Sequence, residues 1–164
     1  MILLNFLYFE SPIGIIRVEY AQSGMHSLQF VPAKGENHSD DPQMEEKILH
    51  DLQSYSQNPA HRWETPIALH LGTEFQEKVW LALRMIPAGE ARSYQEIAQL
   101  IGQPKAAQAV GRANGQNPLL LRVPCHRVIG SDGSLVGYRG ELWRKEWLLK
   151  HEGYRGLSQQ LNLF

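Results

Sequence analysis

The hydrophobic and polar positions of the first third of the chain predict a small sheet covered by a helix. Residues 2–31 alternate or run apolar and break at Ser11–Gly14 and Ser23–Gly24, which predicts three short antiparallel strands. Between Met44 and Tyr55 the apolar residues recur at helical spacing, and this helix is expected to cover the sheet. Residues 65–70 predict one more strand.

From residue 73 the pattern becomes helical, so we place a domain boundary between residues 72 and 73. Thr73 and Ser93 each precede Gln or Glu by three residues, the capping-box spacing that marks a helix start. The predicted helices cover 74–86, 94–101, 105–114 and 141–151. The second and third are separated by a tight glycine-containing turn, which is typical of a helix-turn-helix. The predicted fold class is therefore α+β.

The third predicted helix is rich in small side chains: Ala106, Ala107, Ala109, Gly111 and Ala113. A glycine inside a helix costs about 1 kcal/mol relative to alanine, so we expect Gly111 to serve a close backbone contact. The partner could be another helix in the core or the groove of a nucleic acid, and the pattern alone leaves both open.

Composition excludes several classes of protein. The chain has 164 residues, 43% of them apolar, which is enough for one core or for two small domains. Its single Cys cannot form an internal disulfide, and seven scattered His residues form no metal-ligand pattern. No apolar run is long enough for a signal peptide or a membrane span, so we expect a soluble cytoplasmic protein without membrane contact.

The net charge of −1 is the sum of two unlike parts. Residues 1–72 carry 4 basic and 9 acidic groups, whereas residues 73–164 carry 12 and 8. Between Ile97 and Ser131 there is no acidic residue, and this stretch contains Lys105, Arg112, Arg122 and Arg127. A polyanion could bind there without repulsion, but a chance gap in the acidic residues explains the charge equally well.

The only thiol lies in a reactive context, Pro124-Cys125-His126-Arg127. A nearby base or cation is expected to lower the pKa of the Cys125 thiol toward neutrality. Neighbours in an extended segment point to opposite sides, so His126 is expected to reach the thiol through a water. Glu152, at the end of the last predicted helix, is a candidate to orient His126. By chemistry alone a cysteine hydrolase and an alkyl acceptor both remain open.

Several motifs together resemble the O6-alkylguanine-DNA alkyltransferases, also called methylated-DNA–protein-cysteine methyltransferases. They include Asn117-Pro118, Pro124-Cys125-His126-Arg127-Val128, Gly137-Tyr138 and the run from Lys145 to Gly153. The likeness is continuous from about residue 73 to residue 153. The resemblance implies a ribonuclease H-like N-terminal domain over 1–72 and a helix-turn-helix domain carrying the active site over 73–164.

The resemblance also implies a role for each site residue. Cys125 would take the alkyl group from a flipped-out O6-alkylguanine, and O4-alkylthymine would be a further substrate. Each protein molecule would act once. His126, oriented by Glu152, would take the thiol proton, while Tyr94 would assist the leaving guanine and Asn117 would brace the turn. The Val128 carbonyl, Tyr138 and Arg139 would line the base pocket. The minor groove would meet Ala106, Ala107, Ala109, Gly111, Arg112, Gln108 and Gln95.

The sequence departs from the family at two places. Gln108 stands where an arginine usually enters the base stack, which predicts a weaker hold on the extruded base and weaker or slower repair. Residues 1–72 contain no Cys, so the structural zinc of some members is not expected, and no cofactor is implied. The expected partner is double-stranded DNA containing O6-alkylguanine. The chain is expected to be a monomer in solution, and cooperativity on DNA is left open.

Overall fold

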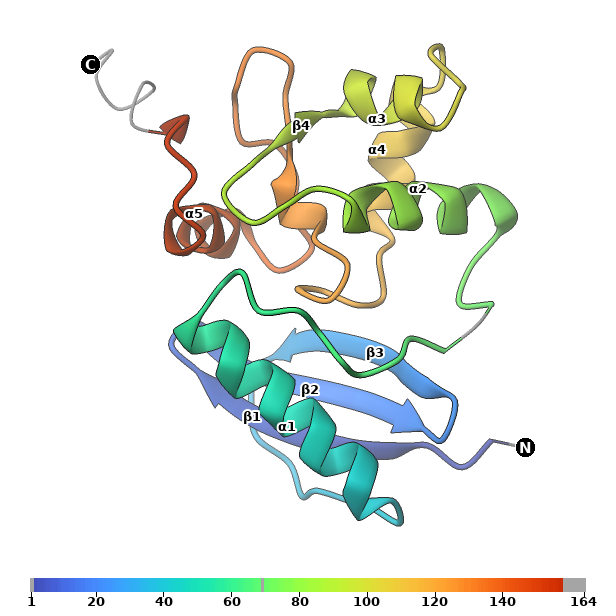
Figure 1. The fold of residues 1–164 in the computed structure, drawn as a ribbon, viewed down its shortest axis with the longest axis vertical. Coiled ribbons are helices and arrows are strands. Elements are labelled where there is room, and N and C mark those ends of the chain that lie inside the picture. The colour runs from blue at the N-terminus through green and yellow to red at the C-terminus, as the bar shows by residue number, and fades with distance from the viewer. Residues whose placement is uncertain (1, 69, 158–164) are drawn as a thin grey trace. The chain divides into compact units, whose positions relative to one another are not determined.

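The computed structural model describes residues 2–68 and 70–157, and its architecture is α+β (Figure 1). Internal contacts divide the chain into two units. The first consists of Met1–Leu71 and Pro118–Arg122, and the second of Gly72–Asn117 and Val123–Phe164. Among the described residues, no helix combines the length and the apolar character needed to span a bilayer.

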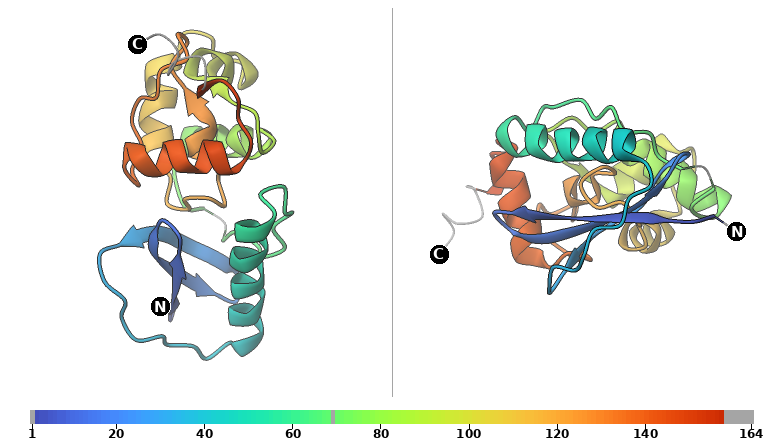
Figure 2. Two further views of the ribbon diagram at one scale, coloured as in Figure 1. Left: turned by 90° about the vertical axis from the view of Figure 1, so that its left-hand side faces the viewer. Right: turned by 90° about the horizontal axis from the view of Figure 1, so that it is seen from below.

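The first unit is a three-stranded antiparallel sheet with one helix along a face, as the sequence predicts. The strands β1 (Asn5–Ser11), β2 (Gly14–Ala21) and β3 (Gly24–Val31) pair in the order β1-β2-β3. Figures 1 and 2 show α1 (Pro42–Gln57) lying against this sheet. The carboxylate of Asp41 accepts a hydrogen bond from the backbone near the start of α1 and caps it. Buried apolar residues of the sheet and helix include Leu7, Ile16, Val18, Leu28, Ile48 and Leu52.

The strand predicted over residues 65–70 is wrong. Only an isolated bridge forms there, between Met25 and Ile67. The buried carboxylate of Asp51 on α1 accepts hydrogen bonds from the backbone N–H and the hydroxyl of Thr65, and from the N–H of Glu64. These contacts bind the start of the segment to the helix and use the N–H of Thr65, while the N–H of Ala68 still donates to the carbonyl of Met25.

The first unit also includes Pro118–Arg122, which a boundary placed at one point of the sequence does not anticipate. The N–H of Leu28 donates to the carbonyl of Pro118 at 2.8 Å, and the N–H of Leu120 donates to the carbonyl of Leu28 at 3.0 Å. Backbone hydrogen bonds to β3 therefore join this short segment to the sheet of the first unit.

The second unit is mostly helical and contains two capping boxes. Thr73 caps α2 and Ser93 caps α3, and each reciprocal pair of hydrogen bonds is present. A parallel pair of two-residue strands and a 3-10 turn complete the unit. Its elements are α2 (Glu74–Arg84), β4 (Arg92–Ser93), α3 (Tyr94–Leu100), α4 (Ala107–Gly115), the 3-10 turn η1 (Cys125–Arg127), β5 (Val128–Ile129) and α5 (Leu142–His151).

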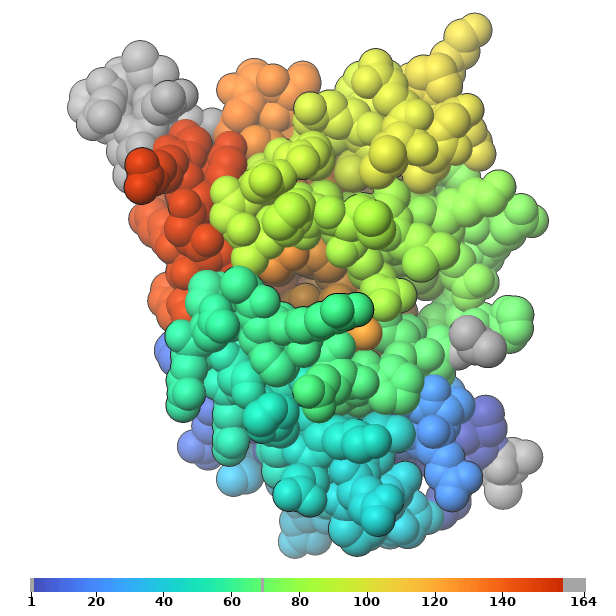
Figure 3. Space-filling view, viewed as in Figure 1, coloured from blue at the N-terminus to red at the C-terminus, as the bar shows by residue number. Residues whose placement is uncertain are grey.

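The helix-turn-helix forms, but α4 begins two residues later than the sequence predicts. The N–H of Ala106 donates to the carbonyl of Gln103, and Ala106 precedes the helix with non-helical backbone angles. Lys105 and Ala106 therefore belong to the turn between α3 and α4. This turn, coloured yellow, protrudes from the face of the second unit that Figure 3 shows. On its other side α4 contacts α2, where the indole N–H of Trp80 donates to the carbonyl of Ala113 at 2.8 Å.

Candidate active site

Two short strands bring the start of α3 beside the segment that carries Cys125. β4 pairs with β5 in parallel, Arg92 opposite Val128 and Ser93 opposite Ile129. Tyr94 directly follows β4, and Cys125 lies in the turn that directly precedes β5. Burial is the main cause that raises the pKa of the Tyr94 hydroxyl, and the charge of an ionised Cys125 raises it further. The second effect agrees with the closeness of the two residues.

Two asparagine amides hold the backbone around Cys125. The Nδ2 of Asn117 donates to the carbonyl of Val123 at 2.8 Å, and the Asn117 side chain also hydrogen-bonds to Cys125. The Nδ2 of Asn114, on α4, donates to the carbonyl of Cys125 at 3.4 Å. Both asparagines are buried. The structure thus places Asn117 where the sequence expects a brace, and adds Asn114, which sequence reasoning missed.

The thiol of Cys125 is almost completely buried, with 1% of the residue exposed. Burial raises its pKa to about 11, although the hydrogen bond from Asn117 and the charge of Lys145 act in the opposite direction. The expectation of a thiol pKa near neutrality is therefore wrong for the protein without DNA. Because desolvation outweighs the nearby donors and cations, the resting thiol is protonated and its reaction requires a base.

A buried chain of polar groups begins at His126, the residue that follows Cys125. The Nε2 of His126 lies 2.7 Å from Oε1 of Glu152. Arg127 donates to both oxygens of the same carboxylate at 2.8 and 2.9 Å, and to the carbonyl of Ile86 at 2.6 Å. Burial alone would raise the pKa of Glu152, but the charges and hydrogen bonds of His126 and Arg127 hold it well below its usual range. The structure therefore brings Cys125, His126 and Glu152 together as predicted.

The local backbone differs from the extended segment that the sequence suggested. Cys125 and His126 lie in the 3-10 turn η1 rather than in a strand. With Nε2 of His126 donating to Glu152, the lone pair of the neutral ring is on Nδ1. This Nδ1 is buried and has no hydrogen-bond partner among the residues that the structure describes. An unpartnered buried acceptor on the residue that follows Cys125 could receive the thiol proton, directly or through a water.

Lys145 is a second site residue that sequence reasoning missed. It lies on α5 with no exposed surface, and its Nζ donates to the carbonyls of Val136 at 2.9 Å and Gly137 at 3.1 Å. The hydroxyl of Tyr94 donates to the same Val136 carbonyl at 3.1 Å. The sequence contained a signal for this burial. Lys145 precedes Leu148 by three residues and Leu149 by four, which places all three on the buried face of the helix.

The residues predicted to line a base pocket lie around the same centre. The ring of Tyr138 faces the ring of His126 edge-on, with centroids 6.4 Å apart. Arg139 is exposed, and its charge lowers the pKa of Cys125 slightly against the effect of burial. The N–H of buried Val128 donates to the carbonyl of Cys125 and closes η1.

The predicted DNA-contacting residues occupy the outer side of the helix-turn-helix. Gln108 and Arg112 are exposed on α4, while Val110 faces inward. A Cβ on Gly111 would lie 3.7 Å from the ring of Tyr94, an ordinary contact, so packing within the described chain does not require glycine there. Gln95 is exposed and donates to the carbonyl of Pro104, bracing the turn. Ala106, Ala107 and Ala109 are half-buried.

Comparisons with known proteins identify the family. A family model described as 6-O-methylguanine DNA methyltransferase, DNA binding domain, matches residues 74–154. The methylated-DNA–protein-cysteine methyltransferase of Methanosarcina acetivorans is 42% identical over 155 residues, which cover 92% of this chain and 99% of the relative. The chain belongs to the methylated-DNA–protein-cysteine methyltransferase family. A Mycobacterium bovis protein of that name is 40% identical over 166 residues, covering 99% of each chain. The Mycobacterium tuberculosis OGT in complex with DNA superposes with a TM-score of 0.80 at 39% identity, covering 93% and 97%.

In this member of the methyltransferase family, two of the four cations in the acid-free stretch are already engaged. Arg127 binds Glu152, as described above. Arg122 donates to the carbonyl of Thr65 within the first unit. These two cations therefore have partners within the chain, and the chance-gap explanation of the charge is sufficient for them. Lys105 and Arg112 remain exposed beside the turn and on α4.

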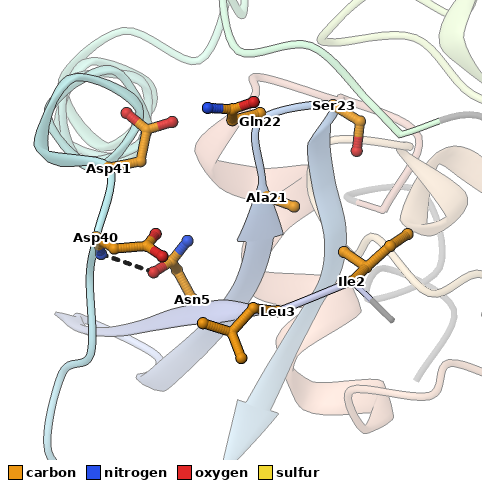
Figure 4. A pocket seen from close by; sticks show the side chains of 8 residues that line it. All are labelled: Ile2, Leu3, Asn5, Ala21, Gln22, Ser23, Asp40 and Asp41. Carbon is orange, nitrogen blue, oxygen red and sulfur yellow. Dashed lines mark hydrogen bonds between the residues drawn. The ribbon is translucent and has the colours of Figure 1, made fainter.

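A pocket in the first unit of this methyltransferase is separate from the predicted site residues. In the first unit a pocket of about 440 Å³ is lined by residues that include Leu3, Asn5, Asp40 and Asp41 (Figure 4). It contains none of the predicted site residues, and its two carboxylates would repel phosphate. Within residues 2–68 and 70–157, no three His, Cys, Asp or Glu side chains gather in a way that could hold a metal ion.

Proposed function

We propose that this chain, as a methylated-DNA–protein-cysteine methyltransferase, repairs O6-alkylguanine in DNA by moving the alkyl group irreversibly to Cys125. The observation that carries the proposal is the buried thiol next to the His126–Glu152 pair, whose Nδ1 has no partner. This arrangement supplies a nucleophile, a base and an orienting carboxylate in a site from which water is excluded.

The reaction balances with the groups present. Nδ1 of His126 takes the proton of the Cys125 thiol, directly or through a water, and Glu152 stabilises the resulting imidazolium. The thiolate attacks the alkyl carbon, so that the sulfur–carbon bond forms as the bond from that carbon to O6 of guanine breaks. The hydroxyl of Tyr94 donates to the departing guanine, which leaves as the normal base. A thioether is not hydrolysed under mild conditions, so each molecule acts once.

Binding to DNA through α4 is the second part of the proposal. The exposed side of α4 carries Gln108 and Arg112, and its first turn has no capping side chain, which leaves N–H groups available to phosphate. O6 of guanine lies on the major-groove edge of the stacked base, so a protein that binds through the minor groove and has a buried thiol requires the base to be flipped out to reach Cys125. The structure of the Mycobacterium tuberculosis OGT in complex with DNA supports DNA as the partner, and we propose that it is double-stranded. We also propose that α4 contacts the DNA through its minor groove.

Gln108 makes weak repair the alternative outcome. A glutamine can hydrogen-bond an orphaned base, but it has neither the charge nor the planar fork of an arginine. Because the side chain is exposed on α4, a substitution there should not perturb the core. Gln108→Arg is therefore expected to bind an O6-methylguanine duplex more tightly and to repair it faster. Equal affinity and equal rate in the two proteins would remove this explanation of weak repair.

Stoichiometry separates this function from that of a cysteine hydrolase. The assay mixes the protein with excess duplex that contains one O6-methylguanine and counts the guanines restored. One guanine for each protein molecule, followed by no further repair, is the expected result. Continued turnover would favour a hydrolase, and a protein that binds the duplex without restoring guanine would favour a lesion-binding role. An undamaged duplex of the same sequence is the control.

A further inference from the structure

Lys145 occupies a place on α5 that an apolar residue would ordinarily fill. Its side chain is completely buried, in the same stripe of α5 as Leu148 and Leu149. Lys150 on the same helix is instead exposed and pairs with Glu146. Burial removes the hydration of the Lys145 ammonium and lowers its pKa to about 8. A lysine here therefore reduces stability relative to an apolar residue of similar length, which indicates a role other than packing.

The contacts of the buried ammonium all go to one loop. Its Nζ donates to the backbone carbonyls of Val136 and Gly137, in the segment between β5 and α5 that also carries Tyr138. Among the described residues, no carboxylate lies within ion-pair distance of Nζ. Besides acting on the Cys125 thiol, the positive charge of Lys145 strengthens its bonds to these carbonyls, since hydrogen bonds from a charged donor are stronger than neutral ones.

The carbonyl of Val136 has two donors. It accepts from the Lys145 ammonium at 2.9 Å and from the Tyr94 hydroxyl at 3.1 Å. A carbonyl oxygen has two lone pairs and can accept both. If Tyr94 is to contact a guanine, its hydroxyl must first leave this carbonyl. The loop then depends on Lys145 to stay where it is.

We propose that Lys145 is a positioning residue: its two hydrogen bonds keep Val136 and Gly137 in place, so that the Tyr94 hydroxyl can move from the shared carbonyl to the DNA. The part that concerns Tyr94 rests on the proposed function. Without Lys145, Tyr94 becomes the remaining donor to the Val136 carbonyl. The Tyr94 hydroxyl would then have to hold the Val136 carbonyl and donate to the guanine, and it cannot donate its one proton to both.

The first experiment needs no DNA and tests the loop alone. It measures the rate of tryptic cleavage after Arg139, an exposed site in the same loop. Lys145→Met removes two hydrogen bonds from a charged donor and is expected to speed cleavage by about tenfold or more. Tyr94→Phe should cleave at nearly the wild-type rate, because Lys145 still holds the loop. Lys150→Met is the matched control on the same helix and should also behave as wild type.

Two results of this experiment would overturn the proposal. One is a wild-type cleavage rate in a folded Lys145→Met variant. The other is faster cleavage in Tyr94→Phe alone, which would mean that Tyr94, and not Lys145, keeps the loop in place. Because Tyr94→Phe is a conservative substitution, this result decides the question even if Lys145→Met does not fold. Lys145→Arg, which keeps the charge and the donors, should retain resistance to cleavage.

The second experiment measures methyl transfer from an O6-methylguanine duplex under single-turnover conditions. Lys145→Met is expected to lower the maximal rate by about tenfold while the duplex concentration at half-maximal rate stays unchanged. The double variant with Tyr94→Phe should lose less than the product of the two single losses, because both act through one hydroxyl. Losses that multiply would contradict the shared carbonyl. A wild-type protein that transfers no methyl group would refute the proposed function, and the cleavage rates would still decide the role of Lys145 in the loop.

Discussion

Replacing Glu152 with glutamine removes one charge from the centre of a buried network. The side chain has no exposed surface and accepts hydrogen bonds from His126 and from two nitrogens of Arg127. Glutamine keeps the shape but leaves the Arg127 guanidinium facing a neutral amide. Because breaking a buried pair leaves an uncompensated charge, the expected loss in the free energy of unfolding is about 3–5 kcal/mol at pH 7.

The same variant should change how stability depends on pH. The pKa of Glu152 is lowered in the folded protein, so its contribution is present above the pKa of an unfolded glutamate, about 4.3. That contribution is lost as the pH falls through the lower folded value. The wild-type protein should therefore lose stability below about pH 4.3, and its advantage over Glu152→Gln should shrink there.

Urea unfolding followed by tryptophan fluorescence at several pH values measures both effects. Glu146→Gln is the matched control, because Glu146 pairs with Lys150 at the surface of the same helix, where a pair contributes at most about 1 kcal/mol. Methyl transfer should also slow by about 10²-fold or more in Glu152→Gln, since His126 loses its orienting partner. A stability equal to that of the control, at all pH values, would refute the reasoning.

Three further predictions concern other parts of the chain. Gly111→Ala should raise the free energy of unfolding by about 0.5–1 kcal/mol in thermal unfolding, because alanine favours a helix and the added methyl group meets the Tyr94 ring at an ordinary distance. The same variant should bind the duplex more weakly if α4 approaches DNA closely, and an unchanged affinity would contradict that approach. Asp51→Asn should cost about 1–3 kcal/mol of stability, since donors on Thr65 lose a carboxylate, while the repair rate of the folded protein stays unchanged. Arg112→Gln should lower the salt dependence of duplex binding by about one ion, and an unchanged salt slope would place Arg112 away from the phosphates.

Local signals in the sequence predicted most of the fold. The capping residues Thr73 and Ser93 fixed the starts of α2 and α3, because a cap satisfies N–H groups within a few residues of itself. The failures depended on partners distant in the chain. Residues 65–70 resemble a strand in sequence, but the buried carboxylate of Asp51 accepts the N–H of Thr65. Pro118–Arg122 joins the first unit through hydrogen bonds to Leu28.

The candidate site shows the same division. Chemistry and resemblance together predicted the contact between His126 and Glu152, residues 26 positions apart. The ionisation of Cys125 could not be predicted, because it depends on burial and not on its neighbours in sequence. Lys145 was missed for a related reason: a lysine in a helix is usually exposed, and only the packing of α5 shows that this one is buried.

Intact mass spectrometry tests the central claim most directly. The protein is incubated with a duplex that contains one O6-methylguanine and is then weighed, beside the Cys125→Ala variant and an undamaged duplex. The account predicts that the wild-type protein gains the mass of one methyl group in place of a proton, at Cys125, and that the variant gains none. A wild-type mass that stays unchanged under excess lesion would contradict it, as would a methyl group on any other residue.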